Sequence, residues 1–224
     1  MAESLSSIRR AFRFDTAASR FRGPNGRFIN AAKLKAGLVS YSRRAGRELQ
    51  TLAERMSRGE MTIEGWQEQT AAQIKNLHIA MAAAGRGGFE RLTNADNGRI
   101  GARLRYQYRK LQGFAEDVQA GRLSPAQIVA RSKLYAASAN GTYERFVQEN
   151  WNDKAAAGVI VQMANVLGFA EHCGSKGGEI GCLDETDRGW VPLGEMSSPG
   201  SRRCKSNCHC HLKYRKVKPK KSRT

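Results

Sequence analysis

The stretch RELQTLAERMSRGEMT, residues 47–62, recurs as RKLQGFAEDVQAGRLS at residues 109–124. Six of the sixteen aligned positions are identical at this offset of 62 residues. In both stretches, helix-forming residues lead to a glycine that can end a helix, and a Thr or Ser three positions later can cap the next one. Six identities can arise by chance, but the matching capping positions favour a repeated helical hairpin.

Apolar residues on either side of both stretches recur at spacings of three and four, which is typical of one face of a helix. The first stripe covers residues 31–57, the second begins after Thr62, and the third ends at Gly121. A capping box at Ser124-Pro125-Ala126-Gln127 begins a fourth helix, which runs towards Trp151. The sequence therefore predicts a mainly α protein, with a helical bundle built from two hairpins over residues 31–170. The stripes consist of Leu34, Leu38, Tyr41, Ala45, Leu49, Leu52 and Met56; Ile63, Trp66, Thr70, Ile74, Leu77, Met81 and Ala84; Ile100, Leu104, Leu111, Phe114 and Val118; and Ile128, Leu134, Tyr135, Phe146 and Val147.

The charge of the chain is strongly positive and unevenly distributed. Its 224 residues contain 38 Lys and Arg against 20 Asp and Glu, a formal net charge of +18. Residues 1–58 contribute +9, residues 59–195 contribute −1 and residues 196–224 contribute +10. This distribution predicts a near-neutral body with two cationic ends, for which a polyanion is the natural partner. There is no run of eighteen apolar residues and no apolar leader at the start, so we expect neither a membrane span nor a secretory signal.

Both ends of the chain are candidate binding segments. Residues 1–30 interleave arginines with phenylalanines, which fits an arm that becomes ordered on a partner or a leader without structure. Residues 213–224 are basic and, by composition, unstructured; they form either a solubilising tail or a segment that binds DNA or an acidic protein surface without reading bases. The candidate contact residues are Arg9, Arg10, Arg13, Arg20, Arg22, Lys213, Arg215, Lys216, Lys218, Lys220 and Lys221.

All five cysteines lie between residues 173 and 210, in a Gly-, Ser- and Asp-rich module at residues 171–212. An odd, clustered set of cysteines favours metal binding over a disulfide framework. Zn²⁺ takes four ligands in a tetrahedron, so two cysteine knuckles brought together would form a structural zinc site with no open position for catalysis. The candidate ligands are Cys173, Cys182, Cys204, Cys208 and Cys210.

The preferred ligand set is Cys173 and Cys182 with Cys208 and either Cys204 or Cys210. Either His209 or His211 could replace one sulfur, and His172 could support the site from outside. Two alternatives remain open: reduced cysteines without a metal, and a disulfide formed in an oxidising medium.

This module resembles the C-terminal end of the phage Mu F-like minor head proteins. The resemblance also covers Asn165-Val166-Leu167-Gly168 and the G-x-L-S turns of the helical body. The chain departs from the family pattern in the insertion GSKGGEIG between the first two cysteines and in the close Ser206-Asn207-Cys208-His209-Cys210. The residues that carry the resemblance in the module are Cys173, Cys182, Trp190, Pro199, Gly200, Cys204, Asn207, Cys208, Cys210 and Leu212.

The resemblance implies a virion component, present in few copies inside the head and associated with the portal vertex and packaged DNA. It would assemble in the host cytoplasm with phage capsid or portal proteins in a multi-copy assembly. The alternative hypothesis is a small zinc-stabilised nucleic-acid-binding protein outside the virion.

A third hypothesis, a nuclease using His172, His209 or His211 around Asn207, is disfavoured because these histidines crowd the structural knuckle. His78 lies beside the second stripe and is predicted to be a helix-surface or packing residue rather than a ligand. We therefore expect a protein that is not an enzyme.

Overall fold

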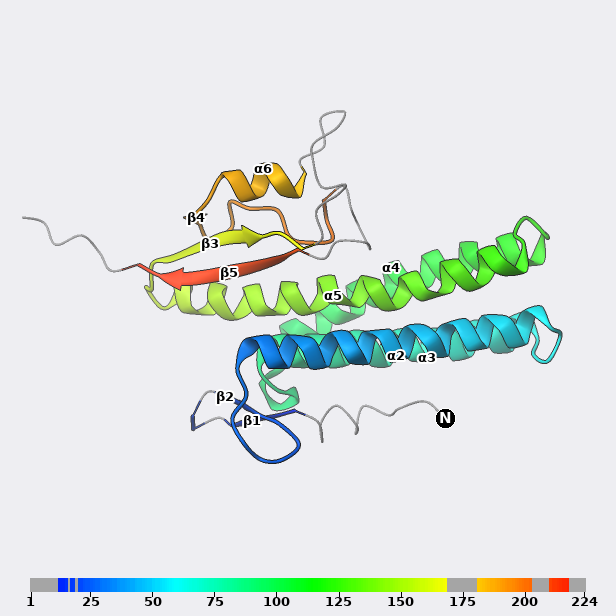
Figure 1. Ribbon diagram of the computed structural model, residues 1–224, viewed down its shortest axis with the longest axis horizontal. Helices are drawn as coiled ribbons and strands as arrows, with labels where there is room; N and C mark the ends of the chain where they lie inside the picture. Colours follow the sequence, from blue (N-terminus) through cyan, green and yellow to red (C-terminus); the bar gives the residue numbers. More distant parts are fainter. Residues whose placement is uncertain (1–11, 16, 19, 169–180, 203–209, 218–224) are drawn as a thin grey trace, which may run out of the picture. The chain divides into compact units, whose positions relative to one another are not determined.

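The chain forms two compact units, Met1–Tyr143 and Glu144–Thr224. The computed structural model describes residues 12–15, 17–18, 20–168, 181–202 and 210–217 (Figure 1). The predicted mainly helical class is confirmed, and the structure adds a two-stranded and a three-stranded antiparallel sheet that the sequence analysis did not predict. Among the described helices, none has the length and hydropathy needed to cross a membrane.

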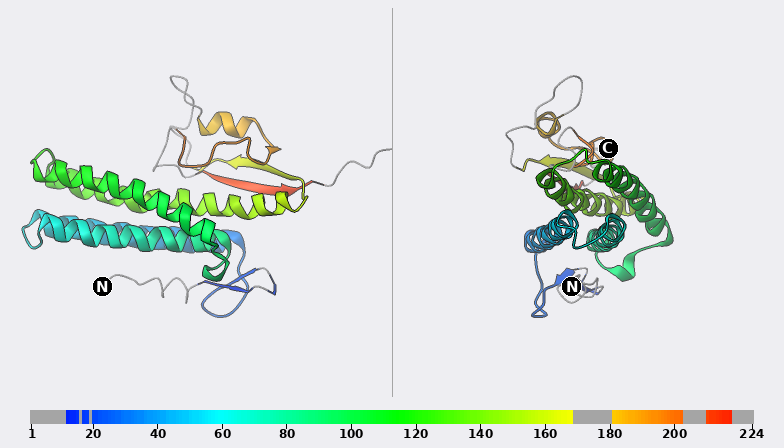
Figure 2. Two further views of the ribbon diagram at one scale, coloured as in Figure 1. Left: turned by 180° about the vertical axis from the view of Figure 1, so that it is seen from behind. Right: turned by 90° about the vertical axis from the view of Figure 1, so that its right-hand side faces the viewer.

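The first unit is built from helices that lie side by side (Figure 2). Its helices are α2 (Ala31–Ser57), α3 (Ile63–Arg86), α4 (Asn94–Gln119) and the first part of α5 (Pro125–Ala156), and the short helix η1 (Phe89–Arg91) joins α3 to α4. The Trp66 ring meets Phe114 edge-on with the centroids 5.1 Å apart, and Phe114 stacks on Tyr135 at 6.2 Å. These aromatic contacts join α3, α4 and α5 in one core. Of the stripe predicted for α2, all members except the half-buried Leu52 are buried.

The two hairpin turns have the same backbone hydrogen bonds at the helix ends. Gly59 and Gly121 adopt left-handed φ angles of 75° and 66°, which cost little only for glycine. The amide of Glu60 donates to the carbonyl of Arg55 at 2.9 Å, and the equivalent bond 62 residues later measures 3.0 Å. This is the Schellman arrangement at both ends, as the aligned sequences predict.

The helix starts that follow these turns are also equivalent. The Thr62 hydroxyl accepts the amide of Gly65 at 3.1 Å, and the Ser124 hydroxyl accepts the amide of Gln127 at 3.3 Å. In the second turn, the Gln127 side chain also accepts the amide of Ser124 at 2.8 Å, which completes the predicted capping box.

The N-terminal segment packs on the helices of its own unit. Strands β1 (Arg13–Asp15) and β2 (Arg20–Arg22) form an antiparallel hairpin. The Phe12 ring occupies the space beside Gly37 of α2 that a side chain at this position would need. The described part of the arm is therefore ordered against the protein itself, while residues 1–11 lie outside the described part of the chain.

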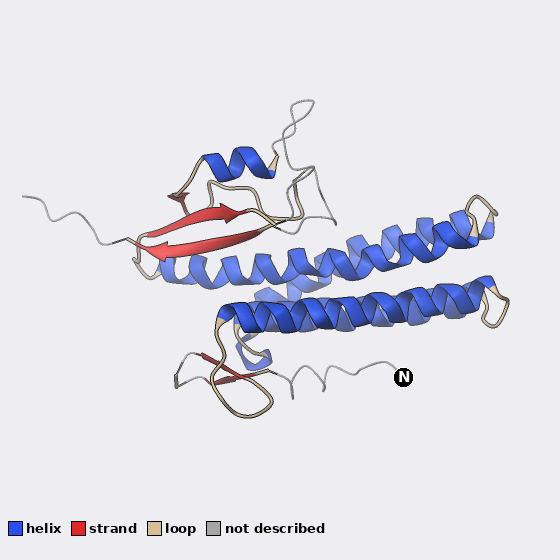
Figure 3. Cartoon of the chain, viewed as in Figure 1, coloured by secondary structure: helices blue, strands red, loops and turns tan. Residues whose placement is uncertain are grey.

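The second unit contains the end of α5 and a three-stranded antiparallel sheet (red in Figure 3). Its elements are β3 (Val161–Val166), α6 (Cys182–Asp187), β4 (Val191–Pro192) and β5 (His211–Lys216), with the strand order β4-β3-β5. Its apolar core is built around the buried cluster of Met163, Val191, Met196 and Leu212.

Two expectations are wrong in this unit. The helical region predicted to extend to residue 170 ends at Ala156, and Val161–Val166 form a strand. The segment predicted to be unstructured from Lys213 onward belongs to β5 as far as Lys216. Leu212 and Tyr214 pack on the apolar core, while Lys213 and Arg215 are exposed. Buried apolar and exposed basic residues therefore alternate as in a strand, although the segment is rich in lysine.

Candidate metal centre and basic surface

Cys182 and Cys210, which are distant in sequence, meet in one buried cluster of the second unit. Cys182 is the first residue of α6 and is fully buried; Cys210 directly precedes β5 and is 5% exposed. Leu167, which follows β3, packs against both. The fold thus brings one cysteine from each predicted knuckle to the same place, as a shared metal site would require.

The remaining predicted ligands cannot be placed. Cys173, Cys204 and Cys208 lie outside the described residues, as do His172 and His209. Among the side chains that the structure does describe, no group of three or more His, Cys, Asp or Glu residues could hold a metal ion. The four-ligand zinc site therefore stays a prediction.

The backbone beside Cys182 is fixed by a buried amide. Asn165 of β3 donates from Nδ2 to the Cys182 carbonyl at 3.1 Å and to the Thr186 hydroxyl at 2.7 Å. The Thr186 hydroxyl donates to the same carbonyl at 2.8 Å, and Asn165 Oδ1 accepts Nη1 of Arg202 at 2.7 Å. Asn165 thereby ties the first turn of α6 to the sheet.

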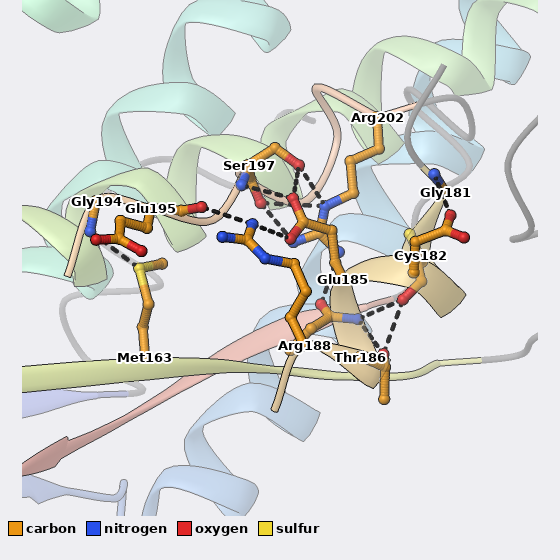
Figure 4. Close-up of polar contacts among 12 residues, drawn as sticks. Met163, Gly181, Cys182, Glu185, Thr186, Arg188, Gly194, Glu195, Ser197 and Arg202 are labelled. Carbon is orange, nitrogen blue, oxygen red and sulfur yellow. Dashed lines mark hydrogen bonds and ion pairs between the residues drawn. The ribbon is translucent and has the colours of Figure 1, made fainter. Parts of the chain in front are cut away.

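A second set of polar contacts secures the loop after β4 to α6 (Figure 4). The Glu185 carboxylate is 1% exposed and accepts the Ser197 amide at 2.9 Å, the Ser197 hydroxyl at 2.5 Å and Nη1 of Arg188 at 2.9 Å. The Arg202 guanidinium, itself buried, donates to the Ser197 carbonyl. Burial opposes the ionisation of Glu185, but the hydrogen bonds from Ser197 and Arg188 and the charge of Arg202 lower its pKa below the ordinary value.

These contacts make the surroundings of the two cysteines rigid. The buried Glu185 carboxylate accepts hydrogen bonds from Ser197 and Arg188, and the buried Arg202 guanidinium donates to Ser197 and Asn165, so both buried charges have hydrogen-bond partners. The cysteine cluster is thus held by α6, β3 and the segment that leads to Arg202. Such a scaffold orients metal-binding side chains; sequence reasoning missed it because its members are spread over residues 165–202.

The predicted N-terminal contact residues are only partly available for a partner. Arg22 donates to Asp15 Oδ2 and to the Gly26 carbonyl, both at 2.8 Å, and lies 3.9 Å above the Phe28 ring. Arg20 also lies over Phe28, at 4.6 Å, and its side chain is exposed. Arg13 is exposed on β1, and Arg9 and Arg10 lie outside the described residues. Arg22 is therefore mainly structural.

The positive charge assigned to the N-terminal end lies largely on a helix. Residues 31–58 contain seven basic and two acidic residues, +5 of the +9 carried by residues 1–58. Arg43, Arg44 and Arg47 of α2 are exposed. The prediction of a near-neutral body with the excess charge at its two ends is therefore wrong for residues 31–58, and a charge count over each predicted helix would have shown this.

The C-terminal contact residues fall into two groups. Lys213, Arg215 and Lys216 are exposed on the edge strand β5, whereas Lys218, Lys220 and Lys221 lie outside the described residues. Trp190 is half-buried and has the Lys213 Nζ atom 5.1 Å and the Arg215 Cζ atom 4.3 Å from its ring centroid. Lys213, Arg215 and Lys216 therefore lie on an ordered strand and not in an unstructured tail.

His78 is a packing residue, as predicted. Its ring is fully buried, with Nδ1 2.7 Å from the Thr142 hydroxyl and Nε2 3.4 Å from the Ser138 hydroxyl. Burial, with a contribution from the charge of Arg103, lowers its pKa to about 3. The imidazole is therefore neutral at physiological pH.

Searches of family models, curated proteins and solved structures returned no match to this chain.

Proposed function

We propose that this protein is a structural component of a phage head, of the Mu F-like minor head type, with a zinc-stabilised C-terminal module and basic surfaces that bind packaged DNA or the portal. The proposal rests on the observation that Cys182 and Cys210 lie together in one buried cluster. These are two of the cysteines on which the resemblance to that family rests, and each belongs to a different knuckle.

The zinc part of the proposal is supported by how the module is held together. Among the described residues of this unit, one apolar cluster consists of Met163, Val191, Met196 and Leu212, and the buried cysteines Cys182 and Cys210 form a second, smaller cluster. A structural Zn²⁺ contributes on the order of 10 kcal/mol to such a fold. Four protein ligands also leave no position for a reacting water, which fits a structural and not a catalytic role.

The DNA part is supported by charge. The segment from residue 196 onward has ten basic residues and no acidic ones, and β5 displays three of them in an ordered strand. Contacts of this kind bind phosphates without reading sequence. The alternative, a nucleic-acid-binding protein outside the virion, uses the same surface.

Mass spectrometry of purified phage particles tests the virion role. We expect peptides of this chain in particles that survive nuclease treatment and density-gradient banding. Their absence from the particles, with DNA binding intact in the purified protein, would favour the alternative. Mg²⁺-dependent nicking of plasmid DNA by the purified protein would instead support the nuclease hypothesis.

A further inference from the structure

One face of β5 carries cations beside an aromatic ring. Leu212 and Tyr214 point to the side of the apolar core, and Tyr214 stacks on Trp151 of α5 with the centroids 5.3 Å apart. Since side chains alternate along a strand, Lys213 and Arg215 point to the opposite side. There they meet Trp190, which precedes β4, and Gln162 of β3. We call Gln162, Trp190, Lys213 and Arg215 the Trp190 face.

The Arg215 guanidinium is held in one orientation on this face. Its Nε and Nη2 atoms donate to Oε1 of Gln162 at 2.9 and 2.7 Å, and its Cζ atom lies 4.3 Å from the centroid of the Trp190 ring. A guanidinium has five N–H donors, so three remain to bind another group. Because its orientation is already fixed, Arg215 loses less side-chain entropy on binding than a mobile lysine would.

Within the part of the chain that the structure describes, the positive charge of this face has no acidic partner. No carboxylate among the described residues forms an ion pair with Lys213 or Arg215. Lys216, the last residue of the strand, lies on the opposite side, and the chain continues with Lys218, Lys220 and Lys221. The face therefore attracts an anion with several charges spaced along it.

We propose that the Trp190 face is an ordered phosphate-binding site for the DNA backbone, with Arg215 as its main contact and Trp190 as the support that orients it. Arg215 would donate to a phosphate through its unused N–H groups, and Lys213 would contact the same or the next phosphate. The proposal rests on the DNA partner given under Proposed function, but not on a location in a phage head. It differs from binding by a flexible tail, in which each lysine or arginine contributes equally.

The test measures binding of full-length protein to two fluorescent 30-base-pair duplexes of unrelated sequence, by anisotropy over a range of salt concentrations. Arg215→Gln is expected to weaken binding roughly tenfold on both duplexes, since it removes a charge-assisted contact. The slope of log affinity against log salt should become shallower by about one unit. The matched control is Lys216→Gln, which removes the same charge from the same strand on the other side; we expect less than a twofold loss.

Two conservative variants separate orientation from charge. Arg215→Lys keeps the positive charge but loses the planar guanidinium with its paired N–H donors. This variant should weaken binding about threefold with an unchanged salt slope. Trp190→Phe keeps an aromatic support and should bind nearly as well as the wild type, whereas Trp190→Leu should resemble Arg215→Lys. Thermal melting of each variant confirms that the fold is retained.

The possible failures are distinguishable. Equal losses for Arg215→Gln and Lys216→Gln would overturn the Trp190 face while leaving DNA as the partner. No DNA binding by the wild-type protein at low salt would overturn both this site and the DNA part of the proposed function.

Discussion

Arg86 at the end of α3 and Asp96 in the first turn of α4 form a bidentate ion pair with almost no access to solvent. Nε lies 2.8 Å from Oδ2, Nη2 lies 3.1 Å from Oδ1, and the two side chains are 6% and 0% exposed. Asp96 also accepts the Thr93 amide at 3.0 Å in a capping box. The pair joins the two hairpins at the point where the chain passes from one to the other.

This pair predicts a strong asymmetry between single and double substitutions. Asp96→Ala leaves the Arg86 guanidinium buried without its carboxylate and removes the capping-box hydrogen bond to the Thr93 amide, and should lower the unfolding free energy by about 3–5 kcal/mol. The double variant Arg86→Met with Asp96→Ala should lose less than the sum of the two single losses. Urea unfolding measures all three values, and additive losses would show that the pair contributes no coupling.

Gly121 predicts an energetic cost that arises from the backbone alone. Its φ is 66°, and a Cβ atom placed on it would have nothing within 4 Å. Gly121→Ala should therefore lower the unfolding free energy by about 1 kcal/mol through left-handed strain, without any steric clash. Gly113→Ala is the matched control, since that position lies within α4 and is equally open. It should raise the unfolding free energy by up to about 1 kcal/mol.

The buried His78 predicts a loss of stability at mildly acidic pH. Its pKa is about 3 in the folded protein and close to 6.5 when unfolded, so the unfolded state takes up a proton first as the pH falls. The unfolding free energy should be unaffected by this group above pH 6.5 and should decrease below it by roughly 1 kcal/mol per pH unit. Between pH 6.5 and 5, Asp96 and Glu185, whose pKa values are lowered in the folded protein, stay ionised there and contribute little to the change.

The variant His78→Gln checks this assignment. Its unfolding free energy should be nearly flat between pH 6.5 and 5 in urea titrations, even if its absolute stability is lower. A slope as steep as that of the wild type would assign the acid sensitivity to other groups.

The cysteine cluster predicts that zinc binds in stoichiometric amounts. Elemental analysis of protein purified without added metal should give about one Zn²⁺ per chain, and Cys182→Ser or Cys210→Ser should each lower that content sharply. Thr186→Val is the control, because it removes a hydrogen bond to the Cys182 carbonyl without removing a sulfur atom. Full zinc content in both cysteine variants, or none in the wild type, would contradict the predicted site.

The sequence predicted the helical unit well because its signals are local. Gly59, Gly121, Thr62 and Ser124 each specify a helix end through contacts within five residues, so the repeated spacing was sufficient to place both turns. The apolar stripes then identified the buried faces of the helices.

The second unit was harder to predict because its determinants are distant in sequence. Val161–Val166 have no turn signal that identifies their partner, and pair with residues 211–216 only through the shared core. The contacts of Glu185, Ser197 and Arg202 join polar residues that no local sequence pattern marks as buried. Lys213 and Arg215 were recognised as candidate contacts, but their fixed positions beside Trp190 depend on the sheet.

The pairing of β3 with β5 has a consequence for the order of folding. The pairing closes a loop of 44 residues, from Leu167 to Cys210, whereas each hairpin turn of the first unit spans five residues. Closing the longer loop costs roughly 2 kcal/mol more in chain entropy, and its contacts stabilise the chain only after closure. Refolding should therefore proceed in two phases, with helical circular dichroism recovering first and the environment of Trp190 and Trp151 later. A metal ion that binds during the second phase would then stabilise the unit that folds last.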